Sequence, residues 1–521
     1  MRVVQPQQLS IGEVDVSNIK FDINSRDDIP RILKGLQFIY VNIDLRNAIF
    51  ALLQLKISPK VSKTNGRPGM NLWAILVCGV IRLDLNIDYD RLLELINQHA
   101  TLRAMLGHNA MDDIHYHLQT IKDNVRLLTP ELLDAVNQLI VKSGHQLVLA
   151  DSTDNEPSEP ILNARCDSFV VETDVHYPTD TNLLFDAMRK IIYLIALLCV
   201  LLGFDGWRQS VKNIKDIKQA MRVTQFKRRS KSKDTEKQEK NEALTKAAHQ
   251  TYIDRAQSYL DKARKTLLEL EKISVKNEMS KPKFDACKEE IEKFMVHADR
   301  QIDQIRRRVI LGEKIPHEEK VFSLFETHTE WISKGKAGVP VELGVKVAIV
   351  EDQHGFILTT KVMENQDDSE IAVEIVKETL EKFPNLKQVS FDKGFHSPDN
   401  QEKLKEILDK VALPRKGKLS AVAKAIEQEP EFIKARKAHS AVESAINALE
   451  VHGLDICPDS GIDGFKRYVK LAMVARNIHR IGDILWEREK EENRSETKRG
   501  KRREEKQAKN DDKSKPDKIA A

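Results

Sequence analysis

The stretch RCDSFVVETDVHYPTD (165–180) combines an apolar core with several carboxylates. Its Val, Phe and Thr residues predict a β-strand, in which alternate side chains face opposite sides. Asp167, Phe169 and Val171 then share one face, whereas Glu172 lies on the other. A carboxylate in such an apolar setting is costly unless it binds something. We therefore expect an acid of this strand to belong to a functional site.

Further runs of the same strand-like texture surround this stretch. Helical patterns separate some of them, such as residues 371–383. Short β-branched and aromatic runs that alternate with helices indicate an α/β domain with a mixed sheet. The other predicted strands are HQLVLAD (145–151), VELGVKVAIVED (341–352), GFILTTKVM (355–363) and LKQVSFD (386–392).

Residues 31–145 predict a helical N-terminal domain, which follows a polar segment at 1–30. GRPGMNLWAILVCGVIRL (66–83) gives a turn and then a buried helix. TPELLDAVNQLIVKSG (129–144) starts with a Thr N-cap before Pro and is expected to end at Gly144. Such a domain could bind DNA, form a dimer, or serve as scaffold.

Residues 205–320 predict a long helical insertion between the strand clusters. Apolar residues recur in alternating steps of three and four along two arms, which is typical of coiled coils. We expect an antiparallel coiled-coil hairpin, either as a spacer or as an arm whose basic clusters at 227–229 and 306–308 reach DNA or a second subunit. The arms carry Ile253, Ala256, Leu260, Ala263, Leu267 and Leu270, then Ile291, Met295, Ala298, Ile302, Ile305 and Val309.

Composition and charge indicate where the protein is located and which segments fold. Five scattered cysteines without a CxxC pair indicate reduced thiols, and the N-terminus has no apolar signal core, so a cytoplasmic location is expected. The apolar run at 191–204 is shorter than the roughly 20 residues of a membrane span and predicts a buried helix. A net charge of +4 does not by itself indicate nucleic acid. The charged tail at 487–521 is expected to be disordered.

Two later acids stand in settings as distinctive as that of Asp167. Asp392 ends an apolar strand at a Gly turn in VSFDKGFHSPDN (389–400), and Glu443 lies on a predicted helix in RKAHSAVESAINALEVHGL (436–454). Carboxylate oxygens are the ligands that Mg²⁺ prefers. Two such ions can support phosphodiester chemistry without a nucleophilic side chain. Together with Asp167, these two acids therefore indicate a binding site for a hard cation such as Mg²⁺.

The three stretches at 165–180, 389–400 and 436–454, in this order, resemble a DDE insertion-sequence transposase, most closely the ISNCY group. The resemblance covers most of residues 60–485. It implies an RNase H-like catalytic core at 146–204 and 321–486, with Asp167, Asp392 and Glu443 as catalytic and metal-binding residues. It also implies Mg²⁺ (or Mn²⁺) as cofactor, transposon ends and target DNA as partners, a homo-oligomer on DNA, and no membrane.

Several basic residues near these acids are candidates for DNA contact. The related signature around the glutamate runs Tyr-x2-Arg-x3-Glu-x6-Lys, whereas this chain has Arg436, His439, Glu443 and Glu450 at those positions. The phosphate-binding lysine of the signature is therefore replaced by an acid. The candidates are Lys393, Arg415, Lys416, Lys418, Arg436, Lys437 and His439.

Alternatives remain open for the first ligand and for the function. Asp151 also ends an apolar run and could replace Asp167, although its DSTDNEP setting favours a turn. Asp180 suits a turn or a helix cap. An RNase H-like nuclease that cuts without joining, or an inactive DNA-binding derivative, would share most of these features.

Overall fold

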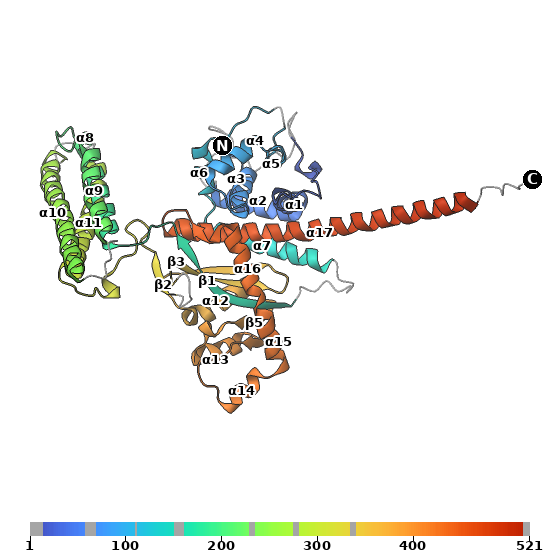
Figure 1. Cartoon of the computed structure of the whole chain (residues 1–521). Helices are drawn as coiled ribbons and strands as arrows, with labels where there is room; N and C mark the ends of the chain where they lie inside the picture. Colours follow the sequence, from blue (N-terminus) through green and yellow to red (C-terminus); the bar gives the residue numbers. More distant parts are fainter. Residues whose placement is uncertain are drawn as a thin grey trace, which may run out of the picture. The chain divides into compact units, whose positions relative to one another are not determined.

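The computed structural model describes residues 14–57, 69–109, 112–150, 161–228, 235–274, 281–333 and 340–513. The chain splits into two compact units (Figure 1). One comprises Met1–Asp174 and Gly344–Ala521, and the other is Val175–Leu343. The fold is α/β, mostly helical with one mixed sheet, as predicted.

Strand β1 (Leu162–Thr173) lies at the centre of the sheet. It pairs antiparallel with β3 (Val341–Asp352) on one side and parallel with β5 (Leu386–Phe391) on the other. The order is β2-β3-β1-β5-β6, with β4 paired to β3 and β7 paired to β1. The shorter strands are β2 (Glu330–Ser333), β4 (Ile357–Met363), β6 (Lys410–Ala412) and β7 (Ile456–Cys457).

The predicted strand at 145–151 is wrong, because helix α7 (Pro130–Leu149) continues through it. Gly144 does not end the helix. A Cβ at this position would lie 2.4 Å from the Phe356 ring, so the glycine lets α7 approach the sheet closely. His145 on the next position is buried and paired with Asp352. Residue 151 itself lies outside the described residues, so Asp151 is not placed.

The N-terminal helices and the sheet share one hydrophobic core. Every residue of α3 (Leu72–Asp84) is buried, and the long helix α17 (Ile462–Lys513) packs against α1, α3, α7 and β4. Figure 1 shows α17 running between the N-terminal helices and the sheet. The other helices are α1 (Ile29–Val41), α2 (Ile43–Ile57), α4 (Tyr89–Gln98), α5 (Ala100–Met105) and α6 (Leu118–Val125), preceded by the turn η1 (Val16–Asn18).

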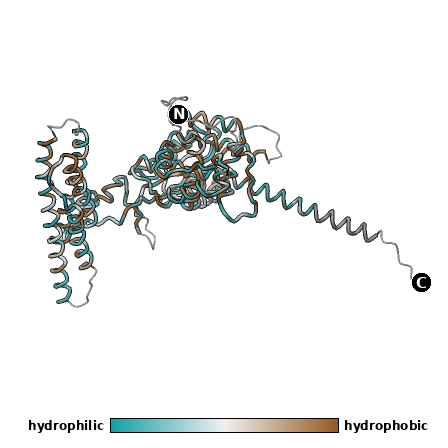
Figure 2. The backbone as a smooth tube through the Cα atoms, turned by 90° about the horizontal axis from the view of Figure 1, so that it is seen from above, coloured by the Kyte–Doolittle hydropathy of each residue, from teal (hydrophilic) through white to brown (hydrophobic). Residues whose placement is uncertain are grey.

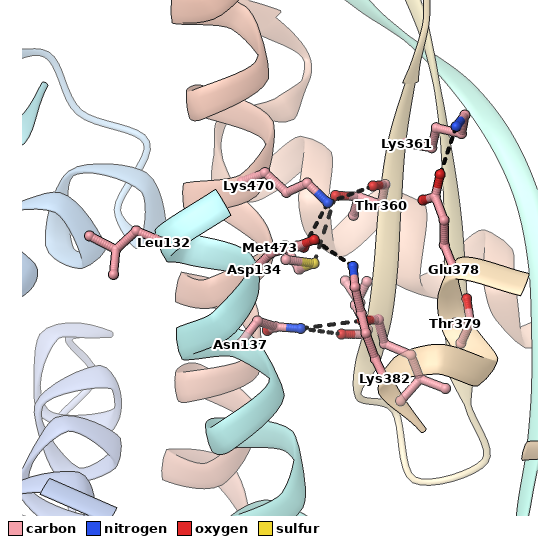
Figure 3. Close-up of polar contacts among 12 residues, drawn as sticks. Leu132, Asp134, Asn137, Thr360, Lys361, Glu378, Thr379, Lys382, Lys470 and Met473 are labelled. Atoms are coloured by element: carbon pink, nitrogen blue, oxygen red, sulfur yellow. Dashed lines mark hydrogen bonds and ion pairs between the residues drawn. The ribbon is translucent and has the colours of Figure 1, made fainter. Parts of the chain in front are cut away.

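A polar cluster joins α7, α12 (Asp368–Lys382), β4 and α17 inside this unit (Figure 3). Lys470 donates to Asp134 Oδ1 and to the Thr360 carbonyl oxygen, each at 2.7 Å, and Lys382 is also paired with Asp134. Asn137 donates to the Ile357 carbonyl oxygen at 3.1 Å. These contacts hold β4 against the three helices α7, α12 and α17.

The second unit contains α8 (Asp180–Leu201), α9 (Ser210–Arg228), α10 (Thr235–Ser274) and α11 (Lys281–Ile305). All the expected heptad positions are buried or, for Val309, partly buried. The same core also contains Leu184, Ile191 and Ile195 of α8, and α11 packs chiefly on α8. The heptad stripes therefore line a bundle shared with α8 and α9. The second unit, Val175–Leu343, therefore includes more residues than the insertion 205–320 expected from the heptads. It is completed by the turns η2 (Arg306–Ile310) and η3 (His317–Glu319).

The charged tail is helical up to Lys513, so the expectation of disorder from 487 is wrong for the described part. Residues 491–499 are exposed, and Figure 2 shows the hydrophilic character of this end of α17. Its Glu, Lys and Arg residues are good helix formers that extend a helix already nucleated by a buried first half. Among the described helices, none alone is long and apolar enough to cross a membrane; α1 and α2, bent at 92°, meet that criterion together.

Candidate carboxylate site

Asp167 and Asp392 occupy neighbouring positions on two parallel strands. In the register, Cys166 on β1 lies opposite Phe391 on β5, and each aspartate is the next residue. Asp167 is partly buried, and its Oδ1 accepts a hydrogen bond of 2.8 Å from the Ser168 amide. The sequence prediction that the two acids share a site is consistent with this register.

The turn after β5 presents Asp392 on the surface. Its residues form the short helix η4 (Lys393–Phe395), and Phe395 is buried with its ring centroid 5.5 Å from that of Phe391. Helix α13 (Pro398–Ile407) follows, capped by Ser397. The buried phenylalanines anchor the turn, so the exposed carboxylate is held at the end of the strand.

Glu443 lies on α16 (Ala441–Leu449), whose buried face is formed by Val442, Ala445 and Leu449. The helix expected through 436–454 is broken at Ser440, and α15 (Pro430–His439) precedes it. At the break, His439 Nδ1 lies 3.2 Å from Ser390 Oγ on β5. This contact ties the end of α15, just before the glutamate helix begins, to the strand that Asp392 follows.

The pKa of Asp167 reports how close the acids are. Burial raises it most, and the charges of Asp392, Asp368 and Glu443 raise it further, to about 6. Asp392 and Glu443, from distant parts of the sequence, therefore lie within electrostatic reach of Asp167. A fourth carboxylate, Asp368, joins them.

Asp368 was not predicted from the sequence. It is the first residue of α12, and Ser168 Oγ donates to its Oδ1 at 2.7 Å. A Cβ added to Gly394 would lie 2.7 Å from Asp368 Oδ2. Asp368 therefore also lies beside the Asp392 turn. The local sequence DDSE signals only a helix start, because Asp367 and Glu370 form a capping box.

The acids fit a hard cation by donor type, since all are carboxylates. They do not form a compact ligand set: among the described residues, the one group of three or more with all ligand atoms within 4.8 Å is Asp84, His452 and His479. The buried Asp84 group could hold a metal ion of its own.

The loop between β6 and α14 (Ala421–Glu427) brings basic residues to the Asp392 turn. Arg415, Lys416 and Lys418 are exposed, and Lys416 Nζ donates to the Gly394 carbonyl oxygen at 2.9 Å. Burial lowers the pKa of His396, and the charges of Arg415 and Lys416 lower it further. The predicted phosphate-binding loop thus lies against the acid cluster.

The remaining DNA-contact candidates differ in exposure. Lys393, Arg436 and Lys437 are exposed. His439 is partly buried, and burial lowers its pKa despite Asp392, so its ring is neutral near pH 7. A neutral, hydrogen-bonded imidazole is suited to positioning the helix and not to neutralising phosphate.

Two residues of the opening stretch, Asp180 and His176, have structural partners in the second unit. Asp180 begins α8, where Thr179 is the N-cap, and its carboxylate accepts from Arg308 Nε at 2.6 Å. His176 Nε2 lies 2.6 Å from Asp186 Oδ2. The basic cluster at 306–308 is also engaged, since Arg307 pairs with Glu313 and Glu319.

No family model, no curated protein and no solved structure matches this chain, so its function has to be argued from the site.

Proposed function

We propose that this chain is a DNA transposase of an insertion sequence, which cleaves phosphodiester bonds at element ends and joins the freed 3′-OH to target DNA in a metal-dependent reaction. The observation that carries the proposal is the convergence of Asp392 and Glu443 on Asp167, whose pKa both acids raise. These are the three acids that the resemblance assigns to catalysis.

The sheet domain then serves as an RNase H-like catalytic core. Support comes from the mixed sheet, in which Asp167 lies on the central strand and Asp392 follows the neighbouring parallel strand. Helix α16 packs beside β1 and carries Glu443. Asp167 and Glu443 therefore lie on regular elements, and Asp392 directly follows one.

Asp167, Asp392 and Glu443 would hold Mg²⁺, or Mn²⁺ in its place, with Asp368 beside them. When bound, two such ions would activate the attacking oxygen and stabilise the leaving oxygen. The chain itself contributes position: Ser168 holds Asp368, and His439 holds the glutamate helix against β5. Ordered carboxylates of this kind are what a metal-dependent cut requires.

The basic loop gives the site a surface for DNA. Arg415, Lys416 and Lys418 are exposed, and Lys416 contacts the Asp392 turn, where a phosphate backbone would otherwise be repelled by the acids. Lys393, Arg436 and Lys437 are exposed nearby in the sequence and extend the proposed contact. Because two transposon ends must be brought together, we expect a homo-oligomer on DNA.

The test uses the full chain, Mg²⁺, DNA that carries the sequences flanking its gene, and a supercoiled target plasmid. Joined products are expected, and Asp392→Ala should abolish them while a mobility-shift assay still detects DNA binding. Asp399→Ala is the matched control, because Asp399 is an exposed acid on the next helix paired with Lys403. Full activity of Asp392→Ala would overturn the site.

The alternatives give different products. Cleavage without joined products would identify an RNase H-like nuclease. Absence of any metal-dependent cleavage, with DNA binding retained, would identify an inactive DNA-binding derivative.

A further inference from the structure

Asp84, His452 and His479 come together where three elements meet. Asp84 is the last residue of α3, His452 lies in the turn η5 (Glu450–Leu454), and His479 lies on α17. Their ligand atoms all lie within 4.8 Å of one another, and all three residues line the interior. This group is separate from the carboxylate site and takes no part in the function proposed above.

The spacing of the three side chains matches a small tetrahedral ion. Asp84 Oδ1 lies 2.8 Å from His479 Nδ1 and 3.7 Å from His452 Nδ1. Ligand bonds of roughly 2.0–2.1 Å in a tetrahedral site place neighbouring donor atoms roughly 3.3 Å apart. The two distances bracket that value, so each donor pair is within about half an ångström of the spacing that a shared ion requires.

A second observation is that the Asp84 carboxylate is incompletely satisfied. Its Oδ2 is buried, and it has no hydrogen-bond partner among the residues that the structure describes. A buried carboxylate oxygen without a partner is costly. A bound cation would remove this cost by accepting one or both oxygens as ligands.

The surroundings orient His479 as a metal-binding histidine is usually oriented. The Nε2 of His479, on the side of the ring away from Asp84, lies 3.5 Å from Asp483 Oδ1. Asp483 is in turn 3.5 Å from Arg31 Nη1. A ligating imidazole commonly donates its second N–H to a carboxylate, which fixes the ring and its tautomer.

His452 reaches the group because the backbone turns sharply after it. Gly453 has φ of 95°, and a Cβ there would lie 2.7 Å from the Tyr468 hydroxyl oxygen. In the metal-free arrangement, His452 Nδ1 donates to the Asp84 carbonyl oxygen at 2.5 Å. Metal binding would exchange this hydrogen bond for a metal bond with little movement of the ring.

We propose that Asp84, His452 and His479 bind one divalent transition-metal ion of the zinc type, which joins the end of α3, η5 and α17. Two imidazoles and one carboxylate suit zinc better than Mg²⁺, which prefers oxygen ligands alone. Because η5 directly follows α16, the ion would also fix the helix that carries Glu443. Its role is structural.

The competing arrangement is a metal-free imidazolium. Burial alone would lower the pKa of His479, but hydrogen bonds to Asp483 and Asp84 outweigh it and raise the pKa to about 9. A protonated His479 between two carboxylates, with the Arg476 charge nearby, would exclude a cation. The two arrangements make opposite predictions about metal content.

The test is to strip the full-length protein with a chelator and titrate it with Co²⁺, followed by Zn²⁺. The expected result is one equivalent of Co²⁺ per chain, visible absorption bands of a tetrahedral site, and their loss when Zn²⁺ displaces Co²⁺. Zinc should also raise the melting temperature of the stripped protein. No stoichiometric binding to the wild-type chain would overturn the proposal in favour of the imidazolium.

Variants locate the ion. His452→Ala and His479→Gln should lose the Co²⁺ bands, whereas His115→Ala, which removes an exposed histidine, should keep them. Asp392→Ala should also keep them, which separates this site from the catalytic proposal. Bands of unchanged intensity in both His452→Ala and His479→Gln would place the metal elsewhere and overturn the assignment. If a variant does not fold, the wild-type titration and melting shift still decide.

Discussion

Ser168 Oγ donates a hydrogen bond of 2.7 Å to Asp368 Oδ1, and this contact holds a fourth carboxylate beside Asp167. The serine follows Asp167 on β1, so one strand both supplies an acid and positions another from α12. The negative charge of Asp368 raises the pKa of Asp167, as the charges of Asp392 and Glu443 do. The site therefore has more negative charge than the three predicted acids provide.

Asp368→Asn should lower metal-dependent cleavage by about tenfold or more, since loss of a residue that supports metal ligands typically costs 10–100-fold. The adjacent Asp367→Asn is the matched control, because Asp367 is largely exposed and Asn preserves its role as N-cap. Cleavage rates at a range of Mg²⁺ concentrations measure the effect. Equal rates for Asp368→Asn and wild type would exclude Asp368 from the site.

Asp167→Asn should stabilise the metal-free protein at pH 7.5. The folded-state pKa of Asp167, about 6, lies above its unfolded value. As pH rises past the unfolded pKa, the unfolded state loses its proton first, so ionisation penalises the folded state. The gain should be about 1–2 kcal/mol at pH 7.5, allowing for partial exposure, and should become small near pH 4.

Melting curves of wild type and Asp167→Asn at the two pH values test this, without divalent ions. Addition of Mg²⁺ should then stabilise the wild type more than the variant. A lower melting temperature for Asp167→Asn at pH 7.5 would show that the carboxylate cluster is not strained.

The parts of the site that the sequence predicted are those with a local signal. Asp392 could be found because an apolar run ends at it beside a glycine, and the helix of Glu443 because its apolar residues recur at helical spacing. Asp368 could not, since its role depends on contact with Ser168, 200 residues away. The same holds for Asp84, His452 and His479, which no local pattern connects.

Two of the errors in the fold arise where tertiary packing overrides a local signal in the sequence. Gly144 resembles a residue that ends a helix. A glycine is needed there because α7 approaches Phe356 closely. The tail from 487 has no aromatic or large aliphatic residue before Ile519, yet it continues a helix that α1, α3 and α7 already hold in place. Hydrophobic content predicts whether a segment can fold alone, not whether it can extend an existing helix.

Lys416→Ala and Arg415→Ala should each weaken DNA binding and reduce the slope of log Kd against log salt by about 1, if each side chain contacts one phosphate. Lys387→Ala is the control, because Lys387 is about as exposed but lies at the start of β5, away from the Asp392 turn. Binding titrations at several salt concentrations measure the slope. A slope unchanged in the double variant would remove the loop from the DNA surface.

Asp134→Ala should destabilise the larger unit by about 2–4 kcal/mol, because it leaves Lys470 and Lys382 without their shared acceptor in a mostly buried setting (Figure 3). Burial would raise the pKa of Asp134, but the two lysines outweigh it and lower the pKa. The stabilisation is therefore present above the unfolded pKa and lost as pH falls through the lower folded value.

Urea unfolding of Asp134→Ala, Lys470→Met and the double variant measures the coupling. The double variant should lose less stability than the sum of the single changes, because the second substitution removes a charge that the first left unpaired. Lys382→Ala should cost less than Asp134→Ala, since Lys470 keeps its bonds to Asp134 and to the Thr360 carbonyl oxygen. Strictly additive losses would mean that the three charges act independently and do not bind α17 to the sheet edge.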